Sequence, residues 1–543
     1  MRESIQRLAS GLQMAWQDFS PSGRQVASLR AVADRALASL PARPPLNEPP
    51  RRVLIDATFD NPNYWLRVGL FRAALGLAGA DTFGIVGPYR QRQVRSTLAH
   101  FGVNGIFDSA PSPSRLDETS RITDALLNSA PDGRSVLNWR LPCDVSPTIV
   151  YDAILKRQRL PSLDVHHPAM RRMCEEAVGR ILRVEEVLDA CKPDLVITSH
   201  PIGMICGPLS DIAVRRGIPV AHLFGLFGVL RFARFGEPDD LVRFYDQPDS
   251  DAIDSLPPET AARLREVGMA YLAARMDGRA DDLASVYAFQ KARAQVDREA
   301  ICAGFGWDPN KPIVGVYASN WFDWPHQLGM LNFADFLDWT QVTVDVAKEV
   351  EEVNWLFKPH PAEAWFGGAA LADIMRDMQV GSNIRLTETK WNAAKVMQSI
   401  DALVTYHGTA GIEFAGQGGA VLLPDRGKYD TSGFALLATS RDDYVAKLRR
   451  TWWKEIDREE VRRRAEVFAG WWFCAPDWQD GFVLGDDACQ DALYAEMVEM
   501  IAREKRAVTH EVDCIRDWWL SGEMHYHTRK MRLADGYRLS NAS

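Results

Sequence analysis

The fold is decided by one stretch, "DALVTYHGTAGIEFAGQGGAVLLP", which runs from Asp401 to Pro424. Its first apolar run ends in "YHGT", and a short helical segment that carries Glu413 follows. A glycine-rich turn at 416–419 then leads into a second apolar run. Short apolar runs bounded by turn residues predict buried strands, and a helix between two such runs predicts that the strands are parallel. The stretch therefore predicts one strand–helix–strand unit of an α/β domain.

The same alternation of strands and helices occurs in the first half of the chain. Asn61 is suited to cap a helix that begins at Pro62, and Gly217 is suited to end a later helix. The predicted strands of this half lie at 51–59, 81–87, Leu195–Thr198 and Pro219–Leu223. Strands that alternate with helices of this length predict a parallel sheet with helices on both faces.

A second series of strands starts at 311–319 and continues at 353–365 before it reaches the opening stretch. Residues 240–300, between the two series, are charged and mostly helical in pattern, without strand-like runs. Two α/β domains that face each other leave a central cleft at the carboxyl ends of their strands, where open α/β sheets bind ligands. We therefore expect the functional site in that cleft.

The chain divides into five predicted regions. Residues 1–50 form an N-terminal amphipathic helix and a proline-rich linker, and residues 51–240 form a first Rossmann-like domain. Residues 241–305 are a helical connector, residues 306–440 form a second Rossmann-like domain, and residues 441–543 are a C-terminal helical region. A length of 543 residues agrees with this division, because domains average roughly 150 residues.

Composition narrows the function classes. The formal net charge of -9 gives no overall basic field, so we expect no nucleic-acid partner. The eight cysteines contain no CxxC pair, which predicts reduced core residues of a cytoplasmic protein rather than a zinc site or a disulfide framework. The first 30 residues lack the apolar core of a secretory signal, and no apolar run approaches the roughly 20 residues of a membrane-spanning helix.

The N-terminal helix and the late tryptophans each allow two interpretations. The N-terminal helix is predicted to pack on the protein body, with a membrane-surface role as the alternative; its apolar positions are Ile5, Leu8, Leu12, Trp16 and Phe19. Many of the 17 tryptophans occur late in the chain, which predicts aromatic packing of C-terminal helices, with an exposed sugar-stacking or membrane-interface surface as the alternative. These residues are Trp452, Trp453, Trp471, Trp472, Trp478, Trp518 and Trp519.

The motif "KPHP" ends the strand predicted at 353–365 and supplies the first candidate site residues, Lys358 and His360. The prolines on both sides of His360 hold it in a stiff, extended turn at the carboxyl end of the strand. A cationic lysine and an imidazole at this position are suited to meet a phosphate. A surface turn with an incidental histidine is the alternative.

The "YHGTAGIEF" segment supplies the second group of candidates. Gly408 and Gly411 allow backbone N–H groups to approach a ligand, Thr409 is suited to cap the helix, and His407 adjoins them. A helix N-terminus favours a phosphate. Glu413, one turn further on, would repel a phosphate but is suited to accept hydrogen bonds from ribose hydroxyls. A structural turn is the alternative, although we expect the "KPHP" strand to precede this one by a single strand–helix unit.

A third group of candidates lies in "VYASNWFDWPH", after the first strand of the second domain. Asn320, Asp323 and His326 occur there among Trp321 and other aromatic residues. Polar side chains in an aromatic wall are typical of a loop that faces a ligand. An aromatic packing loop is the alternative.

Together these motifs resemble the capsule polysaccharide biosynthesis family of GT-B glycosyltransferases, which includes retaining β-Kdo transferases. The resemblance covers roughly residues 190–440 and is strongest over 316–440. It rests on "SNWFDWPH", "KPHP" and "VTYHGTAGIEFAGQGGAVLLPDRGKYDTSGF", in which Tyr429 to Phe434 match the aromatic–glycine segment of the family. The chain has His407-Gly408 where relatives often carry Ser or Asn, so the nucleotide base stays open.

The resemblance implies a GT-B fold whose second domain binds a nucleotide-sugar donor. It places His360 and the Thr409 turn near the donor phosphates and Glu413 near the ribose. It implies metal-independent chemistry without a cofactor, in which fixed dipoles and cations stabilise the leaving group. The first domain would bind a glycan or lipid-linked acceptor. The catalytic candidates are then Asp56 and His200 at strand ends of the first domain, and Asp323 on the donor side.

One motif would instead indicate a metal-dependent enzyme. Asp249 and Asp251 in "PDSDAID" have the Asp-x-Asp spacing of metal-dependent glycosyltransferases. The motif lies in a polar segment outside both predicted sheets, and this spacing is common by chance in a chain with many acidic residues. We therefore expect no metal site there.

The leading hypothesis is a cytoplasmic glycosyltransferase of bacterial surface polysaccharide synthesis, with CMP-Kdo as the first donor to test. Peripheral association with the inner membrane stays open, because such acceptors are often lipid-linked. A CDP-alcohol-dependent polymerase resembling glycerophosphotransferases is the nearest alternative, and a sugar-nucleotide epimerase of the same fold is another. A non-catalytic, nucleotide-binding scaffold of a glycan assembly complex is the alternative from outside the enzymes.

Overall fold

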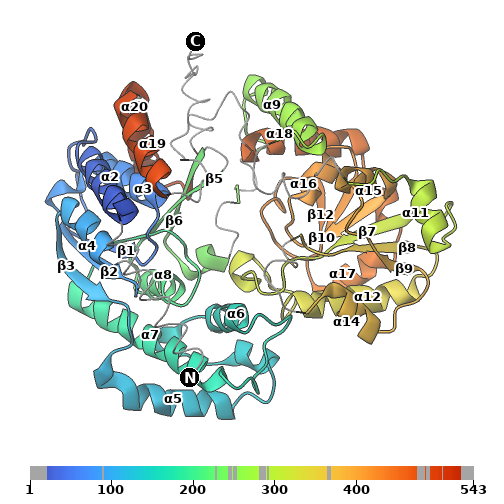
Figure 1. The fold of residues 1–543 in the computed structure, drawn as a ribbon, viewed down its shortest axis with the longest axis horizontal. Coiled ribbons are helices and arrows are strands. Elements are labelled where there is room, and N and C mark those ends of the chain that lie inside the picture. Colours follow the sequence, from blue (N-terminus) through green and yellow to red (C-terminus); the bar gives the residue numbers. More distant parts are fainter. Residues whose placement is uncertain are drawn as a thin grey trace.

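The computed structural model describes residues 21–88, 91–226, 229–242, 247–248, 253–280, 289, 293–361, 363, 369–473, 484, 490–503 and 505–527. They form two lobes, each built around its own sheet (Figure 1). The predicted α/β fold class, with two Rossmann-like domains, is confirmed. The apolar positions of the N-terminal helix between Ile5 and Phe19 lie outside the described residues, as do Asp249, Asp251 and Trp478.

Among the described residues, seven strands form the sheet of the first domain, in the order β13-β6-β5-β4-β1-β2-β3. Strands β1 to β5 pair in parallel, whereas the pairs β5–β6 and β6–β13 are antiparallel. The strand bounds are β1 Arg52–Ala57, β2 Asp81–Val86, β3 Val103–Asp108, β4 Leu195–Thr198, β5 Val220–Leu226, β6 Val229–Phe235 and β13 His525–His527. This order places β1 and β4 side by side, so the loops at their carboxyl ends are neighbours.

Six strands of the described chain form the second sheet, in the order β12-β11-β10-β7-β8-β9, and all of them pair in parallel. Their bounds are β7 Ile313–Tyr317, β8 Asn354–Lys358, β9 Ile384–Leu386, β10 Ala402–Thr405, β11 Ala420–Leu423 and β12 Ala435–Leu437. Strands β7, β10 and β11 are buried along their whole length, as expected for a parallel sheet that helices cover on both faces.

The helices begin and end at the residue types that favour these positions. Asn61 caps α3 by accepting a hydrogen bond from the Asn63 N–H, and Pro62 is the first helical residue, as predicted. Gly217 follows α8 in the left-handed conformation with φ 71°, which agrees with its predicted role at a helix end. The helices of the first domain are α2 Pro21–Ala38, α3 Pro62–Leu75, α4 Gln91–His100, α5 Leu116–Asn128, α6 Pro147–Gln158, α7 Met170–Cys191 and α8 Cys206–Arg215.

The connector and the second domain contain α9 Pro258–Met276, α11 Arg298–Phe305, α12 Phe336–Glu349, α14 Leu371–Asp377, α15 Ala393–Ser399 and α16 Ala410–Ala415. The C-terminal region divides between the two domains. Helices α17 Arg441–Leu448 and α18 Arg458–Trp472 lie on the second domain, where α18 packs along α9. The chain then returns, and α19 Gln490–Arg503 and α20 Lys505–Ser521 pack against α2 and α3 of the first domain (Figure 1).

The late tryptophans pack inside the protein. Six of the seven lie in the described part of the chain, and each of them is at most 7% exposed. The predicted aromatic packing of C-terminal helices is therefore confirmed for these six, and the alternative of an exposed stacking surface is wrong for them. They are Trp452, Trp453, Trp471, Trp472, Trp518 and Trp519.

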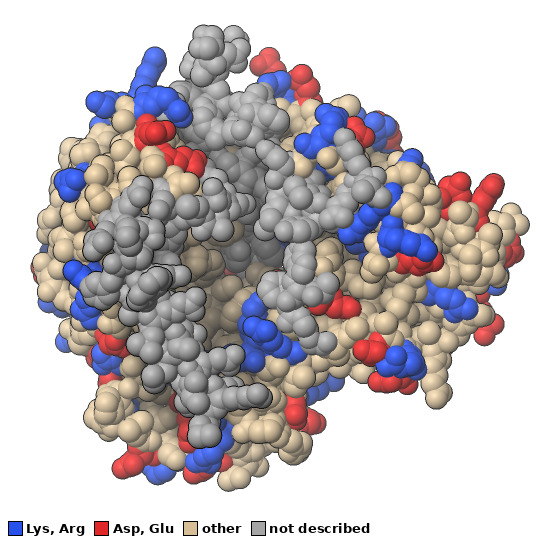
Figure 2. Space-filling view, viewed as in Figure 1, with Lys and Arg blue, Asp and Glu red and all other residues tan. Residues whose placement is uncertain are grey.

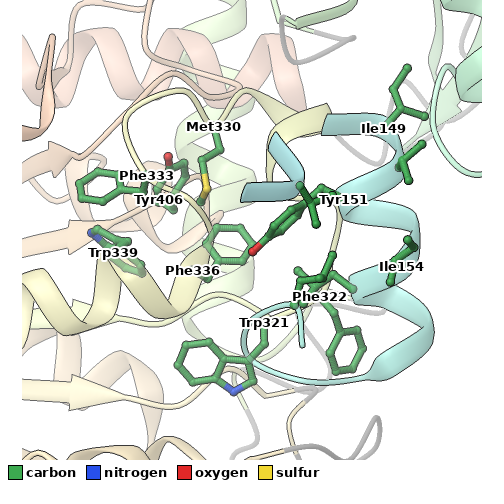
Figure 3. Close-up of a cluster of buried hydrophobic side chains, with 14 of the residues drawn as sticks. Ile149, Tyr151, Ile154, Trp321, Phe322, Met330, Phe333, Phe336, Trp339 and Tyr406 are labelled. Atoms are coloured by element: carbon green, nitrogen blue, oxygen red, sulfur yellow. The ribbon is translucent and has the colours of Figure 1, made fainter. Parts of the chain in front are cut away.

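The two domains share part of one hydrophobic core. Helix α6 of the first domain contributes Tyr151 and Ile154, which lie against Trp321, Phe322 and Phe336 of the second domain (Figure 3). The Tyr151 hydroxyl also donates a 2.6 Å hydrogen bond to a carboxylate oxygen of Asp335. This contact fixes the segment between β7 and α12 against the first domain.

In the part of the chain that the structure describes, we find no helix with the length and apolar character needed to cross a bilayer.

Candidate functional site

Three loops of the second domain meet because of the strand order β10-β7-β8. Asp323 follows β7, His360 follows β8 and His407 follows β10, and the carboxyl ends of parallel strands lie at one edge of a sheet. The expectation that a single strand–helix unit separates β8 from β10 is wrong. The three-residue strand β9 intervenes in sequence and takes the edge of the sheet, so that β8 and β10 flank β7 instead.

The two histidines of this edge are neutral near pH 7. The pKa of His360 is lowered to about 4, chiefly by burial and also by the Lys358 ammonium, against the opposing effect of Asp323. The pKa of His407 is lowered to about 3, chiefly by burial and then by Lys428, again with Asp323 opposing. Both histidines thus lie within electrostatic range of Asp323. A neutral imidazole can donate one hydrogen bond and accept another, which suits it to phosphate and hydroxyl groups.

Two lysines supply positive charge to the same edge. The pKa of Lys358 is lowered to about 8, chiefly by burial, although Glu413 opposes the shift. Its ammonium nitrogen lies 5.0 Å from the centre of the Tyr317 ring. The ammonium of Lys428 lies 5.4 Å from the centre of the Trp472 ring. Aromatic faces favour a cation at such distances, so the two rings help to hold both lysines near this edge.

The surroundings of the site carry further basic side chains. Figure 2 shows that the molecule is hollowed between the two lobes and that Lys and Arg side chains gather at the lower rim of the hollow. The whole chain, by contrast, carries a formal net charge of -9. A rim of this kind attracts anionic ligands into a cleft.

The turn after β10 differs in detail from the prediction. Thr409 occupies the N-cap position of α16, but its side chain makes no capping hydrogen bond, because its backbone is already helical with φ -56° and ψ -22°. At Gly411 an added Cβ would lie 2.1 Å from the Tyr429 hydroxyl oxygen, and that hydroxyl donates a 2.7 Å hydrogen bond to the Gly408 carbonyl. Gly411 therefore makes room for Tyr429, which braces the turn.

Glu413 is buried and ion-paired. Its Oε1 accepts hydrogen bonds from Nε and Nη2 of Arg275, at 2.9 and 2.7 Å, and the two side chains are only 3% and 1% exposed. Arg275 belongs to α9 of the connector, so the connector takes part in the site. The electrostatic effect of Glu413 on Lys358 and on Tyr317 shows that it also lies close to the strand ends.

The loop after β7 places Asp323 between the domains. The Asp323 side chain is 49% exposed, and one of its oxygens accepts a 2.9 Å hydrogen bond from the Lys156 ammonium of α6. Asn320 is buried, and its carbonyl accepts a hydrogen bond from the Asp323 N–H. Trp321 is buried as well and donates to the Ala369 carbonyl. The predicted polar loop is thus present, but its aromatic wall is mainly packing.

His326 anchors the same loop rather than facing the site. The Asp152 carboxylate accepts hydrogen bonds from N and Nδ1 of His326 and from the N–H of Gln327. The Gly203 N–H in turn donates to the Gln327 side chain. The expectation that His326 faces a ligand is wrong, because this bond network buries it in the domain interface.

The first domain has its own carboxylate at a strand end. Asp56 is the penultimate residue of β1 and is fully buried. Its Oδ1 accepts from the Thr58 N–H and hydroxyl, and its Oδ2 accepts from the Thr198 hydroxyl and the Cys206 thiol. Both oxygens are therefore occupied by protein donors, and we interpret Asp56 as a carboxylate that joins β1, β4 and α8.

His200 is the more accessible candidate of this domain. Its Nδ1 lies 2.9 Å from the Ser199 hydroxyl, and its ring stands edge-on to the ring of Phe59 at 5.0 Å. Burial, and then the charge of Arg67, lower its pKa to about 4. A neutral imidazole beside the 41% exposed Phe59 is suited to contact a hydroxyl of an acceptor.

The structure thus brings together most of the predicted donor-site residues. Lys358, His360, His407 and Asp323 lie at or after the ends of three adjacent strands, and Glu413 lies in α16, which follows β10. Asp56 and His200 lie in the first domain, where they were predicted. In the described part of the chain, no group of three or more His, Cys, Asp or Glu side chains is placed to hold a metal ion.

Sequence reasoning missed Lys156, Lys428, Asp152 and Arg275. Lys428 lies within "DRGKYDTSGF", beside a segment already singled out, so proximity in sequence could have found it. The other three lie on α6 and α9, at 167, 174 and 138 residues from their partners. No local pattern marks them, because only the packing of distant helices brings them to the site.

Comparison with known proteins gives weak similarity only. No protein-family model matches the sequence, and no curated protein matches it. Similar solved structures include the UDP-GlcNAc 2-epimerase from Neisseria meningitidis bound to UDP-GlcNAc, with 12% identity over 83% of this chain and 100% of that chain and a TM-score of 0.23. They also include the β-Kdo 2,4-transferase KpsC from Thermosulfurimonas dismutans (13%, 51% and 82%, TM-score 0.30) and a glycosyltransferase from Rickettsia africae (10%, 84% and 100%, TM-score 0.26). These TM-scores are low, so function has to be argued from the geometry.

Proposed function

We propose that this protein is a GT-B glycosyltransferase that transfers a sugar from a nucleotide-sugar donor to a glycan or lipid-linked acceptor. The observation that carries the proposal is the convergence of Asp323, His360 and His407 at the carboxyl ends of β7, β8 and β10, next to two lysines. Neutral imidazoles, ammonium groups and one accessible carboxylate at a strand-end cleft are the groups that bind and activate a phosphorylated sugar.

On the donor side, each group has a distinct role. Lys358 and Lys428 would neutralise the phosphate oxygens of the donor, and the neutral His360 and His407 would donate hydrogen bonds to them. Negative charge grows on these oxygens as the sugar departs. Fixed donors that await this charge lower the barrier without reorganisation, and buried side chains are well fixed. Glu413 would accept a hydrogen bond from a ribose hydroxyl.

On the acceptor side, Asp323 is the proposed catalytic carboxylate. It is about half exposed, lies between the domains and has one oxygen held by Lys156, so its other oxygen can meet an acceptor hydroxyl. A carboxylate in hydrogen-bond reach of that hydroxyl would remove its proton during attack. His200 and Phe59 of the first domain would contact the acceptor, while Asp56 supports the strands beneath them.

The resemblance of "KPHP" and "YHGTAGIEF" to the capsule polysaccharide family supports a finer proposal. The donor would be CMP-Kdo, the product a bacterial surface polysaccharide, and the reaction independent of a metal ion. A lipid-linked acceptor would bring the protein to the cytoplasmic face of the inner membrane.

One observation favours a second candidate function. His360 is neutral near pH 7 because its pKa is about 4, so its imidazole can act directly on a phosphoryl group. A CDP-alcohol-dependent glycerophosphotransferase would use such a histidine. This reaction releases CMP from a CDP-alcohol, whereas a glycosyltransferase releases its nucleotide from a nucleotide sugar.

The test has two stages. Thermal stabilisation of the purified protein is measured with CMP, CDP, UDP and GDP, with and without EDTA, because a ligand that binds the folded state raises the melting temperature. Release of the binding nucleotide is then followed from CMP-Kdo, UDP-GlcNAc and CDP-glycerol. The proposal expects stabilisation that survives EDTA, followed by release from a nucleotide sugar. Release from CDP-glycerol alone would favour the second candidate.

A matched pair of variants locates the site. His360→Ala is expected to abolish stabilisation by nucleotide, whereas His166→Ala, which changes an exposed histidine of the first domain, is expected to leave it intact. Stabilisation that EDTA removes would direct attention to Asp249 and Asp251. Binding without turnover of any donor would identify a scaffold. The absence of stabilisation by all four nucleotides would overturn the proposed nucleotide site.

A further inference from the structure

The Arg275–Glu413 ion pair joins the connector to the proposed donor site. Arg275 lies on α9 and Glu413 on α16, and the two are 138 residues apart in sequence. The Arg275 guanidinium gives two hydrogen bonds to Oε1 of Glu413, and the pair is almost completely buried. Such a pair fixes the carboxylate in one orientation.

Aromatic rings hold the guanidinium from the other side. Its central carbon lies 4.7 Å from the centre of the Phe473 ring and 5.8 Å from that of Tyr271. A buried ion pair is no more stabilising than well-packed apolar residues of the same volume, since desolvation offsets the attraction. Stability alone therefore does not explain why an arginine occupies position 275.

A second buried carboxylate, which pairs with α9 from the neighbouring helix α18 instead of α16, provides a comparison. Glu466 of α18 is 3% exposed, like Glu413, and it also pairs with an arginine of α9. Both of its oxygens are used, because Arg265 donates to Oε2 and Arg462 donates to Oε1. In Glu413 both arginine hydrogen bonds end on Oε1, and Oε2 remains for another donor.

Glu413 lies within electrostatic range of the strand ends. Burial, and then the Glu413 charge, raise the pKa of Tyr317 at the end of β7, and burial lowers the pKa of Lys358 at the end of β8 against the opposing effect of Glu413. A carboxylate oxygen that lies here can accept a hydrogen bond from a sugar hydroxyl of a nucleotide whose phosphates meet Lys358.

We infer that Arg275 is a positioning residue, which orients Glu413 so that its free oxygen accepts a hydrogen bond from a ribose hydroxyl. The inference rests on the proposed nucleotide-sugar function, in which Glu413 contacts the ribose, and adds to it that Arg275 controls this contact through the 2′- or 3′-hydroxyl. Arg275 itself does not touch the ligand.

The experiment compares the affinity of the protein for a ribonucleotide with its affinity for the same nucleotide without ribose hydroxyls. Calorimetry gives the Kd of whichever of CMP, CDP, UDP and GDP stabilises the wild type most, and the Kd of its 2′,3′-dideoxy counterpart. We expect the wild type to bind the ribonucleotide roughly tenfold to a hundredfold more tightly, as for a hydrogen bond to a charged acceptor. Arg275→Met is expected to bring this ratio near one while leaving the Kd of the dideoxynucleotide unchanged.

The variants separate positioning from folding. Arg275→Met leaves a buried carboxylate unpaired, which destabilises a fold strongly. The double variant Arg275→Met with Glu413→Met replaces both charges by apolar groups, so we expect it to fold, to bind the dideoxynucleotide as the wild type does and to show no discrimination. Arg265→Met is the matched control, because it removes an arginine of α9 from Glu466 and is expected to keep the wild-type ratio.

The possible outcomes fall into distinct groups. A wild-type ratio in Arg275→Met or in the double variant would overturn the positioning role. Tight binding of the wild type to both nucleotides alike would also overturn it, although the nucleotide site would stand. No binding of any of the four nucleotides to the wild type would instead overturn the proposed function on which the inference rests.

Discussion

The two sheets carry an acidic residue at the same kind of position, and the two carboxylates are used differently. Asp56 is the penultimate residue of β1, is fully buried and accepts four hydrogen bonds from protein groups. Asp323 follows β7, is about half exposed and has one oxygen bound to Lys156. The hydrogen bonds of the Asp56 carboxylate are all made within the protein, whereas the Asp323 carboxylate is accessible to a ligand.

The difference shows that a polar side chain at a strand end can bind a ligand only if protein groups do not already occupy its hydrogen-bonding positions. In the first domain, Thr58, Thr198 and Cys206 surround the carboxylate, so it links neighbouring strands. In the second domain, Asp323 accepts a hydrogen bond from Lys156 through one oxygen, and its side chain is 49% exposed. The proposed catalytic carboxylate is therefore that of the second domain, whereas Asp56 of the first domain supports the strands beneath the proposed acceptor contacts.

The largest expected effect is on turnover. Asp323→Asn should lower the rate of nucleotide release by roughly a hundredfold to ten-thousandfold, since it removes a catalytic base. The Kd for the nucleotide should change little, and the urea midpoint should stay near that of the wild type. Wild-type turnover in Asp323→Asn would break the comparison between the two carboxylates.

The second expected effect is on stability. Asp56→Ala should lower the free energy of unfolding by about 3 kcal/mol or more, because it leaves several buried donors without an acceptor. Asp323→Ala is the matched control and should change that free energy by no more than about 0.5 kcal/mol. Urea denaturation followed by tryptophan fluorescence measures both. Equal losses for the two variants would show that both carboxylates serve the fold.

The third expected effect is on the pH dependence of nucleotide binding. Lys358 has a pKa of about 8, so it is protonated below pH 8 and loses its charge above it. An anionic phosphate binds the protonated form, and the Kd should therefore rise above pH 8 by up to roughly tenfold per pH unit. Lys358→Arg should abolish this rise, because arginine stays charged throughout. A pH profile unchanged by the substitution would exclude Lys358 from phosphate binding.

The smallest expected effect is on the pH dependence of stability, through His360 of the candidate site in the second domain. The pKa of His360 is about 4 in the folded protein and 6.5 as the ordinary value, so the unfolded chain binds more protons between these values. Stability should thus fall as the pH decreases from 6.5 to 4. His360→Asn should make the fall in melting temperature shallower than in the wild type. His166→Asn, at an exposed position, should leave the slope unchanged.

Strands with long, uninterrupted apolar runs were predictable from the sequence. The eight predicted strands correspond to β1, β2, β4, β5, β7, β8, β10 and β11. The strands that were not predicted have weak local signals: β9, β12 and β13 contain three residues each, β3 is only partly buried, and β6 carries two arginines. Such strands form because a neighbouring edge offers hydrogen bonds, which no local pattern records.

The candidate site was predictable to the extent that it follows strand ends. Prolines beside His360 and glycines beside His407 mark the places where the chain leaves the sheet, and the structure brings these places together. Their mutual position depends on β7 lying between β8 and β10, which is a property of strand order. The burial of His326 against Asp152 was not predictable, because α6 approaches from the other domain.

By itself, the sequence determined where strands end and which polar side chains stand there, because apolar periodicity and turn residues act over a few neighbouring positions. Only the tertiary structure decided which of those side chains a ligand can reach. It surrounds Asp56 with donors, directs Lys156 to Asp323 and Arg275 to Glu413, and returns the C-terminal helices to the first domain. These are contacts between residues far apart in the chain, and they depend on how whole elements pack.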